Sequence, residues 1–269
     1  MGVFDTPLSS TDGQIETVSW NPTTGCDTVS PGCDHCYALT FAKRLKAMGN
    51  VRYQRDGDPR TSGPGFRLSL QPDKLGLPLR WRKPQLVFVD SMSDLFHPDV
   101  PSQYLRRVLA VMRDAGQHTF FTLTKRPGRM ATLLRRLQPV PLPNAWWGTT
   151  VESDHYTWRV DKLRDMPAAV RFLSLQPLLG PVPSLELAGI DWVYIGGESG
   201  VGCRPMDAAW VTDVRDRCLR AGVRFLFKQW GGATRNAGGR LLDGRTWDEM
   251  PPRPCPDRFG GQTRLTSEG

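Results

Sequence analysis

Three cysteines within eleven residues, Cys26, Cys33 and Cys36, restrict what this chain can fold into more than any other feature. Prolines and glycines keep the segment between Trp20 and Cys36 out of regular structure. A β-like run, residues 16–20, precedes this segment, and a helical run, residues 37–48, follows it. Thiolates gathered on a strand-to-helix loop suit a soft metal ion or an iron–sulfur cluster.

The number of thiolates leaves two kinds of site open. A structural zinc ion has four ligands, and His35, which lies between Cys33 and Cys36, would complete a set of three cysteines and one histidine. A [4Fe–4S] cluster with three protein ligands instead leaves one iron free to bind a small molecule. The sequence therefore predicts a metal site at Cys26, Cys33 and Cys36, either a cluster or zinc.

Composition indicates one large domain of a cytoplasmic protein. The chain has 269 residues, which suits an undivided α/β barrel, and 39% of them are hydrophobic, enough for a core. No apolar run reaches the length of a membrane span, and the N-terminus lacks a basic region followed by an apolar one, so no membrane association is expected. Six cysteines in a chain this long are not a disulfide framework. The net charge of +8 favours an anionic partner, nucleic acid first, or else reflects a solvated basic surface.

Apolar runs and amphipathic runs alternate along most of the chain, which predicts repeated βα units and a parallel sheet. Strands are expected at residues 86–89, 119–124, 147–151, 171–175, 191–195 and 224–228, and helices at 101–115, 129–137, 156–164 and 208–221. This pattern fits a barrel or a doubly wound sheet, and periodicity alone does not choose between them. We expect a lead-in over 1–14, the α/β domain over 15–230 with an irregular insertion at 50–85, and an irregular tail over 231–269.

Polar residues follow every expected strand, where the loops of a barrel converge on one mouth. They are Ser91, Ser93, Asp94, Thr124, Lys125, Glu152, Ser174, Gly196, Gly197, Glu198 and Lys228. The ordinary alternative is that the acidic and hydroxyl residues cap helices and that the glycines permit tight turns. Cys203 follows the loop of Glu198 and is a candidate hydrogen-atom donor, whereas Cys218 falls on an amphipathic helix and is expected to be a buried thiol.

The cysteine loop resembles that of the radical S-adenosylmethionine enzymes. Six residues separate Cys26 from Cys33 and two separate Cys33 from Cys36, whereas the commonest spacing in that superfamily is three and two. With Ser-Met-Ser-Asp-Leu-Phe at 91–96 and Gly-Gly-Glu-Ser at 196–199, this spacing resembles the three-Cys-motif family of phages and bacteria over most of residues 15–232. The resemblance implies a partial (β/α) barrel of six to seven parallel strands. It also implies a [4Fe–4S] cluster that cleaves S-adenosylmethionine to a 5′-deoxyadenosyl radical, which then abstracts hydrogen from a substrate.

The resemblance also suggests roles for the residues at the strand ends. It implies that Ser91, Ser93 and Asp94 contact the methionine end of the cofactor. Thr124, Lys125, Glu152 and Ser174 are then candidates for its ribose and carboxylate, and either Lys125 or Lys228 would neutralise the carboxylate. Gly196, Gly197 and Glu198 are further candidates, although their segment follows the sixth strand and not the second, where the superfamily carries its Gly-Gly-Glu. Lys125 and Cys203 are the predicted catalytic residues.

The substrate is less constrained than the cofactors. Ser-Met-Ser-Asp after the second strand and Thr-Lys after the third are distantly similar to the spore photoproduct lyases, DNA-repair members of the superfamily. Together with the basic charge, this favours DNA, RNA or a modified nucleotide as substrate, and a flavodoxin or ferredoxin is expected as electron donor. Two alternatives stay open: a peptide or small metabolite as substrate, and a non-catalytic nucleic-acid-binding protein with zinc at Cys26, Cys33, Cys36 and His35.

Overall fold

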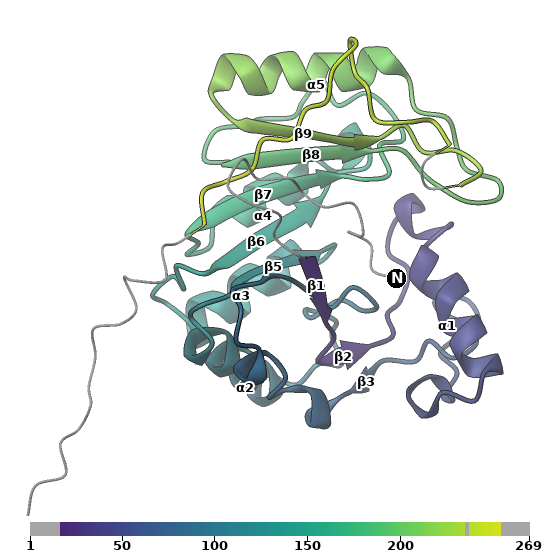
Figure 1. Cartoon of the computed structure of the whole chain (residues 1–269), viewed down its shortest axis with the longest axis vertical. Helices are drawn as coiled ribbons and strands as arrows, with labels where there is room; N and C mark the ends of the chain where they lie inside the picture. The colour runs from purple at the N-terminus through teal and green to yellow at the C-terminus, as the bar shows by residue number, and fades with distance from the viewer. Residues whose placement is uncertain (1–16, 235–236, 254–269) are drawn as a thin grey trace, which may run out of the picture.

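The computed structural model describes residues 17–234 and 237–253. Its main sheet has seven parallel strands. They are β1 (Thr17–Trp20), β4 (Leu86–Val89), β5 (Thr119–Thr124), β6 (Ala145–Thr150), β7 (Val170–Leu175), β8 (Trp192–Gly196) and β9 (Arg224–Gln229). A short antiparallel pair, β2 (Thr23–Thr24) and β3 (Ser69–Leu70), lies outside this sheet. Figure 1 shows the strands curving around one side of the molecule.

Strand order decides between the two architectures that the periodicity left open. The order β1-β4-β5-β6-β7-β8-β9 follows the chain without a reversal, whereas a doubly wound sheet reverses direction at its middle. Right-handed crossovers that always advance in one direction place every helix on the same face and curl the sheet. Among the described residues, β1 and β9 do not pair with each other, so the barrel is open. The predicted partial (β/α) barrel is confirmed, and the doubly wound alternative is wrong.

Alternate strand residues separate two hydrophobic layers. In β4, Val87 and Val89 pack in the large core shared with the helices, whereas Leu86 and Phe88 belong to a second cluster made almost entirely of strand residues. This alternation follows from the period of two in a β-strand. The second cluster fills the concave side of the sheet with aromatic rings, among them Trp146, Phe172 and Trp192. These rings fill the interior of the barrel toward the N-terminal ends of the strands, and the mouth lies at the C-terminal ends.

Helices cover the convex side. They are α2 (Ser102–Asp114), α3 (Pro127–Leu137), α4 (Trp158–Arg164) and α5 (Ala208–Ala221). In α2, Leu105, Val108, Leu109 and Met112 recur at helical spacing and are all buried against the sheet. The Asp207 side chain caps α5 by accepting a hydrogen bond from Ala209 N. By contrast, α1 (Tyr37–Ala47) stands apart from these helices beside the barrel (Figure 1).

The segment between α1 and β4 contains the stretch predicted as an irregular insertion, residues 50–85. It contains β3 and three short 3₁₀ turns, η2 (Val51–Tyr53), η3 (Pro72–Lys74) and η4 (Pro78–Arg80). At the other end, the described residues after β9 include Trp247, which packs its ring against Phe225. The lead-in at 1–14 and the tail beyond residue 253, with Cys255, lie outside the described residues. Within the described part of the chain, no helix combines the length and the apolar character that crossing a membrane requires.

Candidate functional site

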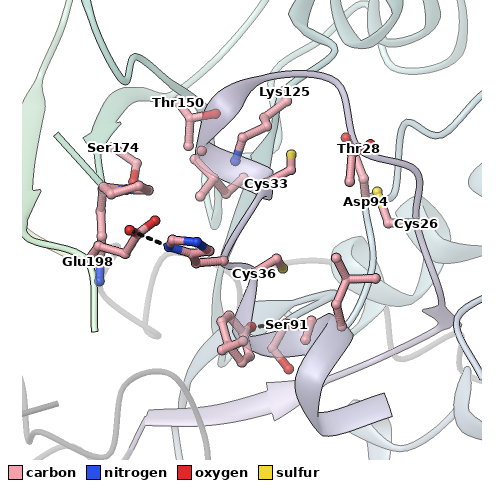
Figure 2. A pocket seen from close by; sticks show the side chains of 18 of the residues that line it. Cys26, Thr28, Cys33, Cys36, Ser91, Asp94, Lys125, Thr150, Ser174 and Glu198 are labelled. Carbon is pink, nitrogen blue, oxygen red and sulfur yellow. Dashed lines mark hydrogen bonds and ion pairs between the residues drawn. The ribbon is translucent and has the colours of Figure 1, made fainter. Parts of the chain in front are cut away.

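One cavity of about 900 Å³ lies at the C-terminal ends of the strands, and Cys26, Cys33 and Cys36 all line it. The three come from one loop: Cys26 follows β2, Cys33 ends the 3₁₀ turn η1 (Pro31–Cys33), and Cys36 immediately precedes α1. Figure 2 shows their side chains spread along the cavity wall. The loop can begin only at a glycine, because Gly25 has a φ of 87° and a Cβ there would lie 2.3 Å from Arg67 O.

The three thiols line the cavity separately, and this bears on both metal sites expected from the sequence. Within residues 17–234 and 237–253, no group of three or more Cys, His, Asp or Glu side chains is arranged to hold a single metal ion. His35, the fourth ligand of the zinc alternative, has another partner in this structure: its Nδ1 donates to Glu198 Oε2 at 2.8 Å. Three separated thiols around one cavity fit a cluster, in which each thiolate binds its own iron. Burial raises the pKa of Cys26 to about 12 and also raises that of Cys36, so metal binding would release protons there.

Three carboxylates of the strand ends hold the cysteine loop, and each comes from a different strand. The first is Asp94, which follows β4. Its Oδ2 accepts a hydrogen bond at 2.7 Å from Arg126 Nη1, and its Oδ1 accepts one from Thr124 Oγ1 at 2.7 Å. Arg126 Nη1 lies 3.5 Å from Cys26 Sγ, and its Nη2 donates to Asp27 O at 3.2 Å. Asp94 thus orients the guanidinium that contacts the first cysteine.

The second carboxylate is Glu152, which follows β6 and is fully buried. Its Oε1 accepts a hydrogen bond at 2.6 Å from Ser30 Oγ of the cysteine loop, and its Oε2 accepts one at 2.8 Å from Arg159 Nη1. A Cβ at Gly32 would lie 2.6 Å from the Glu152 side chain, so the loop packs directly on this carboxylate. Glu152 is absent from the residues that line the cavity. Its contacts are therefore with the cysteine loop and Arg159, and they hold the loop in place.

The third carboxylate is Glu198, which follows β8. It accepts hydrogen bonds from His35, from Arg204 N at 2.9 Å and from Arg204 Nη2 at 2.5 Å. Arg204 Nη2 also donates to Pro31 O at 2.8 Å, so Glu198 and Arg204 together hold the cysteine loop near Pro31, whereas Arg126 contacts it at Cys26 and Asp27. Burial raises the pKa of Glu198, but the hydrogen bonds from Arg204 and His35 outweigh it and lower the pKa to about 2. Figure 2 shows the contact between Glu198 and His35.

The other predicted cofactor residues divide between cavity wall and support. Ser91, Ser93, Asp94, Thr124, Lys125, Ser174, Gly197, Glu198 and Lys228 line the cavity, whereas Gly196, Glu152 and Cys203 are absent from its lining. Several hydroxyls already have protein partners: Ser93 Oγ donates to Gly25 O at 2.6 Å, and Ser91 Oγ donates to Asn21 Oδ1 at 3.1 Å. The thiol predicted to be buried, Cys218, is fully buried in α5.

Two lysines bring positive charge to the cavity. Lys125 Nζ lies 3.6 Å from Glu152 Oε1, and Figure 2 shows its side chain beside the turn that carries Cys33. Burial lowers the pKa of Lys125, but its electrostatic interactions with Cys33, Glu152 and Cys36 outweigh this effect, so the pKa is raised. Lys228 Nζ donates to Gln176 Oε1 at 3.1 Å. Lys125 therefore gives the cavity a positive charge suited to a carboxylate or a phosphate.

Three side chains at this site were not among the predicted site residues. Arg126 and Arg204 both contact the cysteine loop, and the only sequence signal was the position of Arg126 directly after Lys125. Asp90 lines the cavity with a φ of 57°, and it accepts hydrogen bonds from Thr23 N and Oγ1 at 3.0 and 2.8 Å. Burial raises the pKa of Asp90 to about 8 although these bonds lower it. Burial therefore favours the protonated form of this carboxyl group.

Solved structures with a related shape are chains of spore photoproduct lyase. A mutant of that enzyme superposes with a TM-score of 0.45 at 12% identity, covering 67% of this chain and 55% of that one. The enzyme complexed with dinucleoside spore photoproduct gives a TM-score of 0.42 at 13% identity, covering 65% and 54%. This chain thus spans about half the length of the solved chains it resembles.

Comparisons of sequence give a family without an assigned activity. No curated protein sequence matches the chain significantly. Residues 12–251 match the family described as "Protein of unknown function (DUF5131)". The match covers the whole parallel sheet, the cysteine loop and the described residues after β9 up to residue 251. The chain belongs to the DUF5131 family.

Proposed function

We propose that the protein is a radical S-adenosylmethionine enzyme whose [4Fe–4S] cluster is held by Cys26, Cys33 and Cys36. The observation that carries this proposal is that three separated thiols of one loop line a cavity at the open mouth of a parallel partial barrel. The spacing of the cysteines and the segments at 91–96 and 196–199 support it by their resemblance to that superfamily. When bound, the cluster would supply the electron that cleaves S-adenosylmethionine to a radical able to abstract hydrogen from a substrate.

The residues of this chain would bind the cofactor, orient it and exclude water. Lys125 lies beside the turn that carries Cys33, and its ammonium is suited to pair with the methionine carboxylate. Phe88, Leu123 and Tyr194 give the cavity an apolar wall from the concave side of the sheet. Such a wall keeps water from a reactive intermediate. Ser91, Ser174 and Lys228 of the lining remain candidates for hydrogen bonds to the cofactor.

The carboxylates take a different role in this proposal from the one expected on sequence. Asp94, Glu152 and Glu198 are positioning residues for the cysteine loop, because their oxygens already accept hydrogen bonds from arginine side chains. A loop held from three sides keeps its thiols in place before metal binds, which lowers the cost of ordering the site. We further propose DNA, RNA or a modified nucleotide as substrate, and a flavodoxin or ferredoxin as electron donor.

The proposal is tested by anaerobic purification followed by assays of iron, sulfide and zinc. We expect about four irons per chain, retention of iron in Cys218→Ala, and loss of iron in Cys33→Ala. Cys218 is the matched control because its thiol is buried in α5, away from the cavity. Addition of S-adenosylmethionine and dithionite should then release 5′-deoxyadenosine. One zinc per chain, with no cleavage of the cofactor, would contradict the radical mechanism and favour the zinc-binding alternative.

A further inference from the structure

The outer face of α1 carries exposed apolar side chains beside the mouth of the cavity. Tyr37, Phe41 and Met48 are 46%, 38% and 70% exposed, and Arg44 lies between them at the same helical spacing. The opposite face, with Ala38 and Ala42, packs on a small cluster below the helix. The exposed side chains therefore form one stripe, Tyr37–Phe41–Arg44–Met48. Apolar side chains that are exposed side by side on one helix face are a feature of surfaces that bind a partner.

The stripe begins inside the cavity. Tyr37 lines the cavity together with the cysteines, and its hydroxyl donates a hydrogen bond to Ser91 O, so the ring is held in one position at the mouth. Val29, also of the lining, is 42% exposed. Figure 1 shows α1 beside the barrel with no other helix against its outer side. A long ligand that lies on α1 would therefore reach the cavity at Tyr37.

Positive charge is concentrated around the same stripe. Residues 37–67 contain seven lysines and arginines but two aspartates, so this segment contributes +5 of the net charge of +8. Lys46, Arg52 and Arg60 pair with carboxylates. The others are exposed, and within the described part of the chain none has a carboxylate partner; they are Lys43, Arg44, Arg55 and Arg67. Lysines and arginines without carboxylate partners can bind phosphate groups, and aromatic rings beside them can stack on flat bases. This combination suits a nucleic acid.

We propose that the stripe Tyr37–Phe41–Arg44–Met48 binds single-stranded nucleic acid and leads one nucleotide into the cavity. Bases stack on Tyr37 and Phe41, and the phosphates lie against Lys43, Arg44 and their neighbours. A single strand fits better than a duplex, because a stacked and paired base cannot reach a group inside a cavity. This inference deepens the proposed function, since it names the substrate class of the same cavity, but the binding that it predicts requires no cofactor cleavage.

The test is fluorescence anisotropy with a labelled oligothymidylate and the matching oligouridylate, using the anaerobically purified full chain. We expect Phe41→Ala to weaken binding by about fivefold to 150-fold, the loss of one stacked base. Lys43→Gln combined with Arg44→Gln should reduce the slope of log K against log salt by about 1.4, which is about 0.7 for each lost phosphate contact. The two probes distinguish DNA from RNA by their relative affinity.

Matched controls lie on helices away from the cavity. Arg106→Gln removes an exposed arginine of α2, and Leu219→Ala removes an exposed apolar side chain of α5. Neither should change the affinity or the salt slope. All these positions are exposed, so circular dichroism should show that the variants remain folded. Equal binding by the α1 variants and the controls would overturn the inference, as would unchanged oligonucleotide binding combined with slower reduction by an electron donor.

The outcomes also separate this inference from the proposed function. If the chain contains no iron but still binds oligonucleotides through Phe41 and Arg44, the proposed nucleic-acid surface stands and the proposed radical mechanism is refuted. The chain could instead carry the cluster and cleave S-adenosylmethionine, while its α1 variants bind oligonucleotides as the wild type does. The proposed enzyme activity would then stand, and the proposed nucleic-acid surface would be refuted. The two experiments therefore fail independently.

Discussion

Replacing Glu152 by alanine separates its two interpretations, cofactor ligand and support for the cysteine loop. The carboxylate is fully buried and accepts hydrogen bonds from Ser30 at 2.6 Å and Arg159 at 2.8 Å, with Lys125 at 3.6 Å. Arg159 is 2% exposed and stacks on Tyr156, with 4.3 Å from its guanidinium carbon to the ring centroid. Alanine would leave this guanidinium buried without its counter-charge.

The expected loss of stability is large because the whole pair is out of water. Removing one partner of a buried ion pair costs about 3–5 kcal/mol, since the remaining charge is left uncompensated. A domain of ordinary stability has a free energy of unfolding of about 5–15 kcal/mol, so Glu152→Ala should remove a substantial part of it. An exposed pair gives the matched comparison. Asp161 pairs with Arg164 but is itself 71% exposed, and Asp161→Ala should cost less than about 1 kcal/mol.

Urea unfolding measures these differences, and the m-value shows whether the denatured state has changed. In the double variant Glu152→Ala/Arg159→Met, no buried guanidinium is left unpaired. Its loss of stability should therefore be smaller than the sum of the two single losses. Because Ser30 also loses its acceptor, the iron content of Glu152→Ala should fall with its stability.

A different pattern would refute this reasoning. Suppose that the free energy of unfolding of Glu152→Ala lies within about 1 kcal/mol of the wild-type value and that the variant keeps its iron. If it then no longer binds S-adenosylmethionine, the carboxylate faces the cofactor, as the sequence suggested. Binding is measured by equilibrium dialysis with the labelled cofactor. Additive losses in the double variant would show that Glu152 and Arg159 do not depend on each other.

Three further measurements test the site. The pKa of Glu198 is lowered from 4.5 to about 2, so the stability that its ionised form contributes is complete above pH 4.5 and is lost as the pH falls toward 2. The free energies of unfolding of wild type and Glu198→Gln, measured with urea, should therefore converge over that range. A constant difference would contradict the assignment. Gly197→Ala places a Cβ 1.9 Å from Trp230 O; thermal unfolding should reveal about 1–3 kcal/mol of destabilisation, whereas lost cofactor binding at unchanged stability would indicate a direct contact. Cys203→Ala should retain iron and cofactor cleavage, because this thiol is absent from the cavity lining; iron loss equal to that in Cys33→Ala would refute the three-cysteine ligand set.

Much of the fold was readable from the sequence because its signals are local. The helix predicted at 208–221 has those bounds, and the strand predicted at 171–175 begins one residue earlier, at Val170. Apolar runs covered on both faces and amphipathic runs of helical period define βα units without reference to distant residues. The grouping of polar residues at one rim followed as well, because parallel strands bring their C-terminal ends together. Nine of the eleven strand-end positions predicted as site residues line the cavity, as do the three predicted cysteines.

Pairing across long sequence distances was not readable. Glu152 bonds Ser30, 122 residues away, and Glu198 bonds His35, 163 residues away. A carboxylate at a strand end looks the same in sequence whether it faces a ligand or an arginine of a neighbouring loop. Its role depends on which charged group the folded chain brings to it, and that choice is made by packing.

The sequence by itself determined the alternation of strands and helices, the position of the three thiols on one loop, and the concentration of positive charge in residues 37–67. Only the tertiary structure decided that the sheet is an open barrel with its strands in chain order, and that the thiols surround a cavity without converging on a single metal ion. It also decided that α1 leaves its aromatic face exposed. The physical reason is that periodicity and charge are properties of neighbouring residues, whereas strand order, burial and ion pairing depend on segments that meet only when the chain is folded.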